Sequence, residues 1–392
     1  MNESNASVMS NTSHQQRNTL DSTTQIAMLS AYSINFTLAL SGNILILYIV
    51  MTKPYMKSTI NFLIANMAVA DLLMALFAMP YSMFLLYFGS LWFGGLMGQL
   101  TCKVVQFIIG LSIAASIVTL IVISLDRFFA IVYPFRRSRI IKKISITITA
   151  IWLTAAILIG PLLYIYKTET DNSGNFRCIV SFGEDIVYTF QTMRIYNTVV
   201  FAVLYFAPLV LIALFYLAIC RKLWLRKIPG NPSAMNLRTA NKSKKRSIKM
   251  LIIIVFVFAI CWLPVHIMHY YIFYRHDIYN RFPPYVSLVA FFVSHANSAI
   301  NPFLYIILNK NFMKAFLDIA EKLMYWRHSN GSRANTSTSM TNLSIVAKDH
   351  QGLSFGASFE GKSGHYHVDK ADDLPRPFLQ VSLVKASQLT KL

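Results

Sequence analysis

The sequence predicts an all-α membrane protein, a bundle of seven transmembrane helices followed by a short amphipathic eighth helix. Of its 392 residues, 55% are hydrophobic and 13% are charged, about half the charged fraction of a soluble domain, which is roughly 25%. The content of 28 Phe and 20 Tyr excludes disorder for most of the chain. The third observation is a series of long uncharged runs, where about 20 residues are enough to cross a bilayer. An ordinary soluble enzyme is therefore excluded.

Seven runs are long and apolar enough to be spanning helices. We expect them over 26–52, 59–87, 99–132, 145–165, 192–222, 246–275 and 283–308. The second run continues through Asp71, and Gly89, Gly94, Gly95 and Gly98 mark the loop before the third. Only helices or closed barrels satisfy the backbone in lipid, and these runs are too long and too continuously apolar for barrel strands.

Basic residues predict the orientation. The connections 53–57, 133–143 and 221–249 are basic, and the last has ten Lys or Arg and no acid. The opposite connection 167–194 has three basic and four acidic residues. Since cytoplasmic loops carry the basic excess, we expect the N-terminus outside a plasma membrane and the C-terminus inside. The basic residues of the cytoplasmic loops account for the net charge of +20, so no nucleic-acid partner is predicted.

The polar N-terminal segment 1–25 supports this orientation. It lacks the apolar centre of a signal peptide. It holds three glycosylation acceptors, Asn2, Asn5 and Asn11, which have meaning only on the lumenal side.

Two of the four cysteines, Cys102 and Cys178, are expected in the oxidising compartment, so we predict that they pair. The long loop that they close would contribute about 4 kcal/mol in the loop-entropy account. Cys220 and Cys261 fit buried small apolar residues.

Polar residues and prolines inside the spans are candidate functional residues. Asp71 would be either a hydrogen-bond hub or a cation site, since hard cations take oxygen ligands. Asp126 and Arg127 end the third span, where they would pair with each other or extend toward the interface. The oxygen-bearing residues expected at the depth of Asp71 are Asn43, Ser116, Asn297, Ser298 and Asn301, and the expected proline kinks are at Pro208, Pro264 and Pro302.

Taken in order, motifs in each span resemble those of the rhodopsin-like (class A) G-protein-coupled receptors over about 26–326. They are Gly42-Asn43, Met67-Ala68-Val69-Ala70-Asp71, Trp92-Phe93-Gly94, Asp126-Arg127-Phe128, Trp152, Pro208 with Tyr216, Phe258 with Cys261-Trp262-Leu263-Pro264, and Asn301-Pro302-Phe303-Leu304-Tyr305. Met67 stands where Leu is usual, and the distance from Trp92 to Cys102 is longer than typical.

The resemblance implies roles for these residues. Asp71, Ser116, Asn297, Ser298 and Asn301 would form an allosteric sodium pocket. Ile117, Pro208 and Phe258 would form a switch under Trp262, the kinks at Pro264 and Pro302 would let helices swing, and Arg127, Tyr216 and Tyr305 would rearrange to admit a G protein. Many relatives have an acid at the inner end of helix six that pairs with the arginine, but residues 242–246 contain none. Arg127 would then pair only with Asp126, which would lock the inactive state weakly.

A ligand cavity is expected between the outer halves of the helices. We predict that it is lined by Tyr81, Gln106, Ile109, Ile113, Trp262, His266, His269, Phe291 and His295. Each histidine could instead make an interhelical hydrogen bond. Amine receptors of this family have an Asp in place of Ile109, and opsins have a Lys near the place of His295, so the sequence looks more like receptors of the neuropeptide Y, neuropeptide FF or tachykinin kind.

This resemblance predicts an extracellular peptide ligand that acts through a heterotrimeric G protein. The alternatives are a non-peptide small molecule as ligand, or a seven-helix channel or transporter, although the spans hold only two carboxylates, Asp71 and Asp126. Sodium apart, no cofactor is expected, and no pattern of an enzyme is present.

The expected organisation is an extracellular segment 1–25, a bundle 26–308, an amphipathic helix 309–326 and a cytoplasmic tail 327–392. No Cys follows the amphipathic helix, so a palmitoyl anchor is not predicted. Ser and Thr dominate 329–344, either as a linker or as sites whose phosphorylation by receptor kinases recruits arrestin. The C-terminal Thr390-Lys391-Leu392 matches the pattern that PDZ domains bind, although so short a match arises easily by chance.

Overall fold

The computed structural model describes residues 21–133, 143–182, 185–224 and 234–324. The chain divides into two compact units, Met1–Met324 and Tyr325–Leu392, and only the first contains described residues. The predicted glycosylation sites Asn2, Asn5 and Asn11, the tail 327–392 and the PDZ pattern ending at Leu392 lie outside them.

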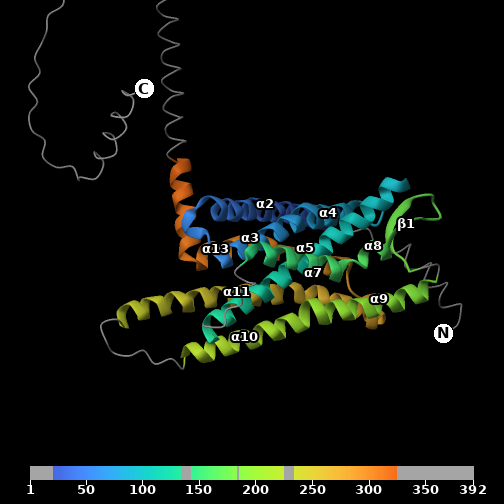
Figure 1. Ribbon diagram of the computed structural model, residues 1–392. Coiled ribbons are helices and arrows are strands. Elements are labelled where there is room, and N and C mark those ends of the chain that lie inside the picture. The colour runs from blue at the N-terminus through green and yellow to red at the C-terminus, as the bar shows by residue number, and fades with distance from the viewer. Residues whose placement is uncertain (1–20, 134–142, 183–184, 225–233, 325–392) are drawn as a thin grey trace, which may run out of the picture. The chain divides into compact units, whose positions relative to one another are not determined.

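Seven helices in the described part are long and apolar enough to cross a membrane, which confirms the predicted fold class (Figure 1). They are α2 (Ser22–Thr52); α3 (Thr59–Leu73) continued by η2 (Met74–Ala78) and α4 (Met79–Phe88); α5 (Gly95–Val132); α7 (Ile144–Ile159) with α8 (Leu162–Ile165); α9 (Ile186–Phe201) continued by η3 (Ala202–Phe206) and α10 (Ala207–Trp224); α11 (Ala234–Tyr274); and α13 (Pro284–Leu308). Two short helices, η1 (Pro54–Met56) and α12 (His276–Tyr279), lie in connections. Residues 310–324 form the predicted eighth helix.

The helix ends differ from the predicted span ends. The fifth span begins at Ile186 rather than 192, and α11 begins at Ala234 rather than 246. An uncharged run reports where the chain meets lipid, whereas a helix can continue beyond it into water. The basic stretch before the sixth span is therefore partly helical.

A two-stranded sheet was not predicted. Strand β1 (Tyr166–Thr170) pairs antiparallel with β2 (Phe176–Val180) in the connection between the fourth and fifth spans. In the turn, the Asp171 carboxylate accepts the N–H groups of Ser173 and Asn175 at 2.9 Å each, and Gly174 has φ 81°, a value that glycine adopts without strain. We call the end of the bundle that carries this sheet the hairpin end and the opposite end the Arg127 end.

Helix α5 is central in the bundle, where it contacts α3, α7, α10 and α11. It can do so because its middle is rich in small residues, which allow helices to approach closely in membranes. A Cβ on Gly110 would lie 2.7 Å from Ile159 Cγ2. The same holds for α2 and α13, since a Cβ on Gly42 would lie 2.9 Å from Pro302 Cβ.

Two spans contain a wide π-helical turn at a proline. In η2 the N–H of Met79 bonds to the oxygen of Met74, and in η3 the N–H of Ala207 bonds to the oxygen of Ala202. Each wide turn ends two residues before a proline, Pro80 or Pro208. A proline ring clashes with the carbonyl four residues earlier in a regular helix, so the wide turns relieve that clash.

Apolar side chains cover the outside as well as the core. Ile157 is 77% exposed and Leu217 66% exposed, which in a spanning helix places them against lipid. The main core lies toward the Arg127 half and includes residues from all seven spans.

Candidate functional site

Asp71 is the centre of a buried polar network that joins the second and seventh spans. Its carboxylate accepts hydrogen bonds from Ser298 Oγ at 2.8 Å and from Asn301 Nδ2 at 2.9 Å. Asp71 is 2% exposed. Asn43 extends the network to the first span, because its Nδ2 donates to the backbone oxygen of Ser298 at 3.0 Å.

A small cavity lies beside Asp71. It is lined by Ala70, Asp71, Met74, Ser112, Ile113, Ser116, Phe258, Trp262, Asn297 and Ser298. Its volume of about 10 Å³ is close to the ~10–15 Å³ that one water needs. Four of the predicted sodium-pocket residues thus line a space for one small occupant, in which Trp262 forms one wall. The fifth, Asn301, does not line it but donates a hydrogen bond to Asp71.

The residues around this cavity fit a hard cation. The side-chain oxygens of Asn297 and Asn301 are buried without a hydrogen-bond partner among the described residues. Together with the carboxylate of Asp71 and the hydroxyl of Ser116 they supply the oxygen ligands that such ions take. Asp71, Ser116, Asn297 and Asn301 would hold sodium, whose charge would offset that of the buried carboxylate.

Aromatic and histidine side chains of the fifth, sixth and seventh spans meet above Trp262 toward the hairpin end. The ring of His266 lies 4.4 Å from that of Tyr205, and His269 lies 6.1 Å from Phe291, between ring centroids. Tyr205 also donates to the backbone oxygen of Ala259 at 2.8 Å. Three of the predicted ligand contacts, His266, His269 and Phe291, therefore occupy one region.

The remaining predicted ligand contacts do not all lie in that region. Ile109 and Ile113 are half-buried on α5. Gln106 is buried on the same helix, and the ring of Tyr81 lies 6.0 Å from that of Trp92 between centroids. His295 lies elsewhere, because its Nδ1 is 3.4 Å from Tyr32 Oη on α2 and its residue is 6% exposed. For His295 the structure favours the interhelical hydrogen bond over ligand contact.

The Arg127 end holds the other predicted switch residues. Arg127 donates to Asp126 through Nη2, and also through Nε at 3.1 Å. The oxygens of Ser124 Oγ and Tyr216 Oη lie 3.2 Å apart, which links α5 to α10. As the sequence shows, α11 contributes no acid to this end over 234–274.

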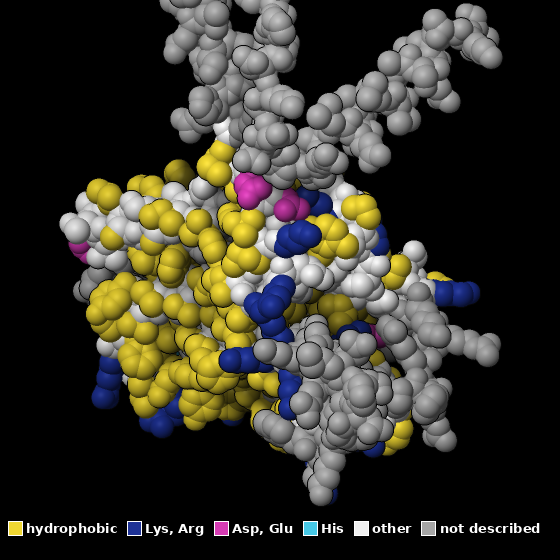
Figure 2. Space-filling model, turned by 90° about the vertical axis from the view of Figure 1, so that its left-hand side faces the viewer, with side chains coloured by type: hydrophobic (Ala, Val, Ile, Leu, Met, Phe, Trp, Pro, Cys, Tyr) yellow, Lys and Arg dark blue, Asp and Glu magenta, His cyan; other side chains and the backbone are white. Residues whose placement is uncertain are grey.

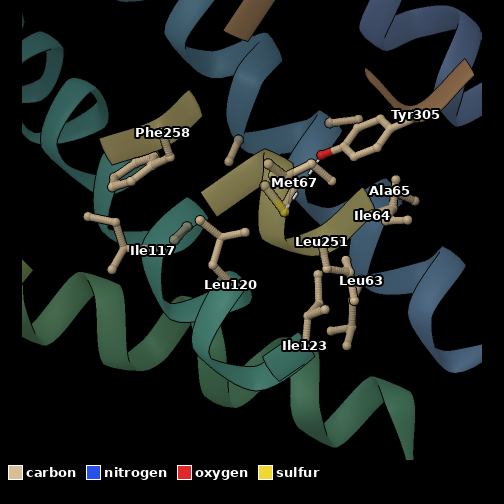
Figure 3. Close-up of a cluster of buried hydrophobic side chains, with 14 of the residues drawn as sticks. Leu63, Ile64, Ala65, Met67, Ile117, Leu120, Ile123, Leu251, Phe258 and Tyr305 are labelled. Atoms are coloured by element: carbon tan, nitrogen blue, oxygen red, sulfur yellow. Dashed lines mark hydrogen bonds between the residues drawn. The ribbon is translucent and has the colours of Figure 1, made fainter. Parts of the chain in front are cut away.

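Tyr305 and the core switch are buried together. Tyr305 is 0% exposed, and its hydroxyl donates to Met67 Sδ at 3.7 Å (Figure 3). Ile117 and Phe258 belong to the same cluster, and Phe258 lies 5.9 Å from Trp262 between ring centroids. The unusual methionine at position 67 thus has a contact of its own, to the tyrosine of the last motif.

The hairpin is fixed to α5 at the other end. Cys102 and Cys178 form the predicted disulfide. Backbone bonds add to it, since the N–H of Trp92 donates to Phe176 O at 2.8 Å. Trp92 Nε1 donates to Gly98 O at 2.9 Å, so the long separation between Trp92 and Cys102 is taken up by additional helix at the start of α5.

Acidic residues at the hairpin end are engaged with neighbours. Hydrogen bonds from the backbone of Asn175 and from Arg177 hold the pKa of Asp171 below its usual range. A hydrogen bond from Arg275 lowers the pKa of Asp277 in the same way. Asp185 caps α9 by accepting the N–H of Val187 at 2.8 Å.

Sequence reasoning missed one polar connection. Asn66 Nδ2 donates to Thr119 Oγ1 at 2.9 Å and Asn66 Oδ1 accepts Trp152 Nε1 at 2.8 Å. The second, third and fourth spans are joined through this asparagine. The signal was present, because Asn66 is a polar residue inside an apolar run.

Comparison with known proteins agrees with this architecture. The sequence profile described as "7 transmembrane receptor (rhodopsin family)" matches residues 42–305. The substance-K receptor of Homo sapiens is 32% identical over 289 residues, which cover 73% of this chain and 71% of that protein. The pyroglutamylated RF-amide peptide receptor of Rattus norvegicus is 29% identical, and the match covers 75% of this chain and 69% of that protein. The neuropeptide FF receptor 2 of Mus musculus is 30% identical, and the match covers 74% of this chain and 71% of that protein.

The matched family consists of receptors rather than enzymes. Its profile spans the first-helix Gly42-Asn43 through Tyr305, which is the range over which the motifs occur in order. The chain belongs to the rhodopsin-like (class A) family of G-protein-coupled receptors.

Proposed function

We propose that this receptor binds an extracellular peptide and activates heterotrimeric G proteins through movement of α11. The observation that carries the ligand class is the likeness to the RF-amide peptide and neuropeptide FF receptors over about three quarters of the chain. A receptor for a non-peptide small molecule is the alternative that the test below addresses.

The binding region supports a ligand with an apolar or aromatic end. Ile109, Ile113 and Phe291 offer apolar surface, and His269 offers a polar group beside Phe291. No carboxylate occurs between Cys102 and Leu125, so a small amine has no counterion on α5. Binding sites of this kind are mostly apolar with few polar groups.

The position of Trp262 supports a coupled mechanism. It lines the cavity beside Asp71 and lies on the same helix as His266 and His269. A ligand that favours an outward position of α11 would change the sodium site, and by linkage sodium would weaken agonist binding. The pair Arg127–Asp126 and the contacts of Tyr216 and Tyr305 would then open to admit the G protein.

The remaining assignments follow from the sequence. We place the chain in the plasma membrane with residues 1–25 outside and glycosylated, the bundle over 26–308, the eighth helix over 309–326, and the tail 327–392 inside. In the tail, receptor kinases and arrestin would act on 329–344, and Leu392 would be the anchor for a PDZ domain.

A screen of neuropeptides, with nucleosides and neutral lipids as a second set, tests the ligand class in cells that carry a promiscuous G protein and a calcium reporter. We expect a peptide to activate the receptor. Its potency should fall at least tenfold in His269→Ala and Ile113→Ala. The matched control is Ile267→Ala, which removes a side chain that is 45% exposed on α11 and should leave potency unchanged. Activation by a lipid or nucleoside, with no response to any peptide, would overturn the peptide assignment.

A further inference from the structure

An exposed apolar patch lies at the hairpin end, where α5 begins. The side chains of Leu96, Met97 and Leu100 are 82%, 72% and 54% exposed, and Phe93 in the preceding loop is 62% exposed. Figure 1 shows these first turns of α5 at an outer edge of the bundle, and the same helix contacts β1. We call these four side chains the α5 patch.

The loop before α5 turns its polar groups inward and leaves the patch outside. Trp92 Nε1 donates to Gly98 O at 2.9 Å and to Thr101 Oγ1 at 3.1 Å. The hydroxyl of Thr101 in turn donates to Met97 O at 2.8 Å. A Cβ on Gly98 would overlap the backbone oxygen of Phe93, so the loop packs directly on the first turn of the helix. The patch is therefore held in its exposed position by specific contacts.

The patch continues the lipid-facing surface of α5. Gly98, Cys102 and Gln106 are buried on one face of this helix. Leu100 and Val104, which is 38% exposed, lie on the opposite face, because residues four apart share a face of a helix. Val104 belongs to the membrane span, so the patch lies one turn beyond a position that contacts lipid.

The sequence around the patch is uncharged. No Asp, Glu, Lys or Arg occurs between Asp71 and Lys103, whereas Lys and Arg side chains lie between apolar surfaces at the opposite end of the bundle (Figure 2). Residues 1–20 are mostly polar and offer few apolar side chains that could cover the patch. Large exposed apolar surfaces mark contacts with a membrane or with another protein, and continuity with the lipid-facing surface favours the membrane.

We propose that the α5 patch inserts into the interfacial layer of the lipid leaflet at the hairpin end, among the headgroups and upper acyl segments of uncharged phospholipids. Apolar contact would drive the insertion, and no basic residue between Asp71 and Lys103 attracts anionic lipids. The depth is limited, because the first N–H groups of a helix lack partners within it and Gly94, the N-cap of α5, has no side chain to accept them. Such groups are excluded from hydrocarbon but can bond to water and phosphate oxygens between headgroups.

Insertion would also fix the hairpin, because the hairpin is bound to this loop. The N–H of Trp92 donates to Phe176 O at 2.8 Å, and the N–H of Cys178 donates to Ser90 O at 3.1 Å. Lipid would thus hold the start of α5 and strand β2 together. The inference needs only the membrane-spanning fold and does not depend on the ligand class.

The depth of the patch can be measured on the full-length receptor in phosphatidylcholine nanodiscs. A fluorescent NBD group is attached to Leu96→Cys or, for comparison, to Ser173→Cys in the exposed hairpin turn, both with Cys220→Ser to remove the half-buried free thiol. A nitroxide on the lipid headgroup or on the upper acyl chain should quench the label at position 96 at least threefold more than the label at 173, and aqueous iodide at least threefold less. Replacing a third of the lipid with phosphatidylserine should change neither ratio.

Two outcomes of this measurement would overturn the proposal. Equal quenching by iodide at positions 96 and 173 would place the patch in water. Protection of position 96 from both iodide and the lipid nitroxides would mean that a protein segment or a second copy covers it. Melting temperatures equal to that of wild type establish that the labelled receptors fold.

A second arm tests the link to the hairpin by hydrogen exchange of segments 90–92 and 176–178 in the same nanodiscs. Leu96→Ser with Met97→Ser should speed exchange there at least fivefold. Gln99→Ser removes an exposed polar side chain from the same helical turn and should leave exchange unchanged. Equal exchange in the two variants would show that lipid does not hold the hairpin and would overturn that part of the proposal.

Discussion

Asp71 shows how much of the bundle depends on one side chain. It receives hydrogen bonds from two residues of α13, and Asn43 joins the same helix from α2. Desolvating a carboxylate is costly unless partners or a cation compensate. The acceptor oxygens of Asn297 and Asn301 have no partner among the described residues, so they would be available to an ion that completes the compensation.

Sodium should therefore stabilise the wild-type protein and not Asp71→Asn. An ion that binds the folded state stabilises it in proportion to the logarithm of its concentration, and we expect of the order of 1–2 kcal/mol near saturation. The melting temperature of purified receptor in sodium chloride and in choline chloride measures this without a ligand. Ser294→Ala is the control, since in the described part of the chain Ser294 Oγ donates to Phe291 O of the same helix at 2.7 Å. Sodium should stabilise that variant as it does wild type. Equal sodium responses in wild type and Asp71→Asn would refute a sodium site.

The depth of Asp71, Ser298 and Asn301 along their helices could be read from the sequence, because spacing within a span fixes depth. The direction of His295 could not. A rotation about the axis of α13 decides whether it faces the ligand region or Tyr32, and that rotation depends on how α2 packs. The pairing of Asp171 with Arg177 was hidden for a similar reason, since it depends on an unexpected turn.

Among the elements, the hairpin is held over the end of the bundle where we propose that the ligand binds. The strands β1 and β2 are held over the bundle by the Cys102–Cys178 disulfide and by backbone bonds to the loop before α5. The Asp-Asn-Ser-Gly turn at 171–174 was present in the sequence. The charge balance of this connection predicts its side of the membrane and carries no information about strands.

Cys178→Ser should reduce display at the cell surface and abolish the response to agonist, because the hairpin would lose its covalent link to α5. Flow cytometry of an N-terminal tag measures display, and the calcium reporter measures response. Cys220→Ser removes a thiol that forms no disulfide and should leave both unchanged. A normal response in Cys178→Ser would mean that the backbone bonds suffice.

The contact between α2 and α13 should be sensitive to a single methyl group. In Gly42→Ala the new Cβ would lie 2.9 Å from Pro302 Cβ and Cγ, so one helix must shift, at a cost of about 1–3 kcal/mol. We expect a lower melting temperature than wild type. Ser41→Ala, at the exposed neighbouring position, should leave it unchanged, and equal melting of the two variants would show that the helices adapt freely.

For the whole molecule, the proposed mechanism makes the balance between inactive and active states depend on what holds α11 near Arg127. Arg127 is held by Asp126 on its own helix, and α11 offers lysines and an arginine at this end instead of an acid. In the mechanism proposed above, the energy gap between the two states would then be small, and a small gap populates the active state without ligand.

Lys244→Glu should therefore lower agonist-independent nucleotide exchange on a G protein in membranes that contain equal amounts of receptor. An acid there would give Arg127 a partner on α11 that exists only in the inactive arrangement. Lys249→Glu makes the same change in charge on the same helix at a different angle and should have a smaller effect. If neither variant differs from wild type, the missing acid has no part in basal activity.

The number, order and type of the spans could be predicted because lipid imposes long apolar runs. Their packing could not, since it is decided by close approaches such as Gly110 against Ile159 and by shared polar residues such as Asn66. A basic groove lined by Arg246 of α11, Ile307 of α13, and Lys310 and Lys314 of the helix 310–324 also escaped prediction. Arg246 and Ile307 are far apart in the chain, and in the sequence the basic residues indicate only the topology.

The wide turns η2 and η3 have a consequence for how this receptor can diversify. In a regular helix each residue rotates the side-chain direction by about 100°. A π-helical turn, whose hydrogen bond joins residues five apart, contains one residue more than a regular turn. The wide turn therefore sets the direction of the side chains in the part of the span beyond it. Thr198 is an example, because its hydroxyl oxygen lies 2.6 Å from that of Tyr274. Deletion of one residue from Ala202–Phe206 would rotate the side chains of α9 about the helix axis. The side chains of α10, including Tyr216, would keep their direction. The hairpin end and the Arg127 end of the fifth span can thus acquire new contacts separately.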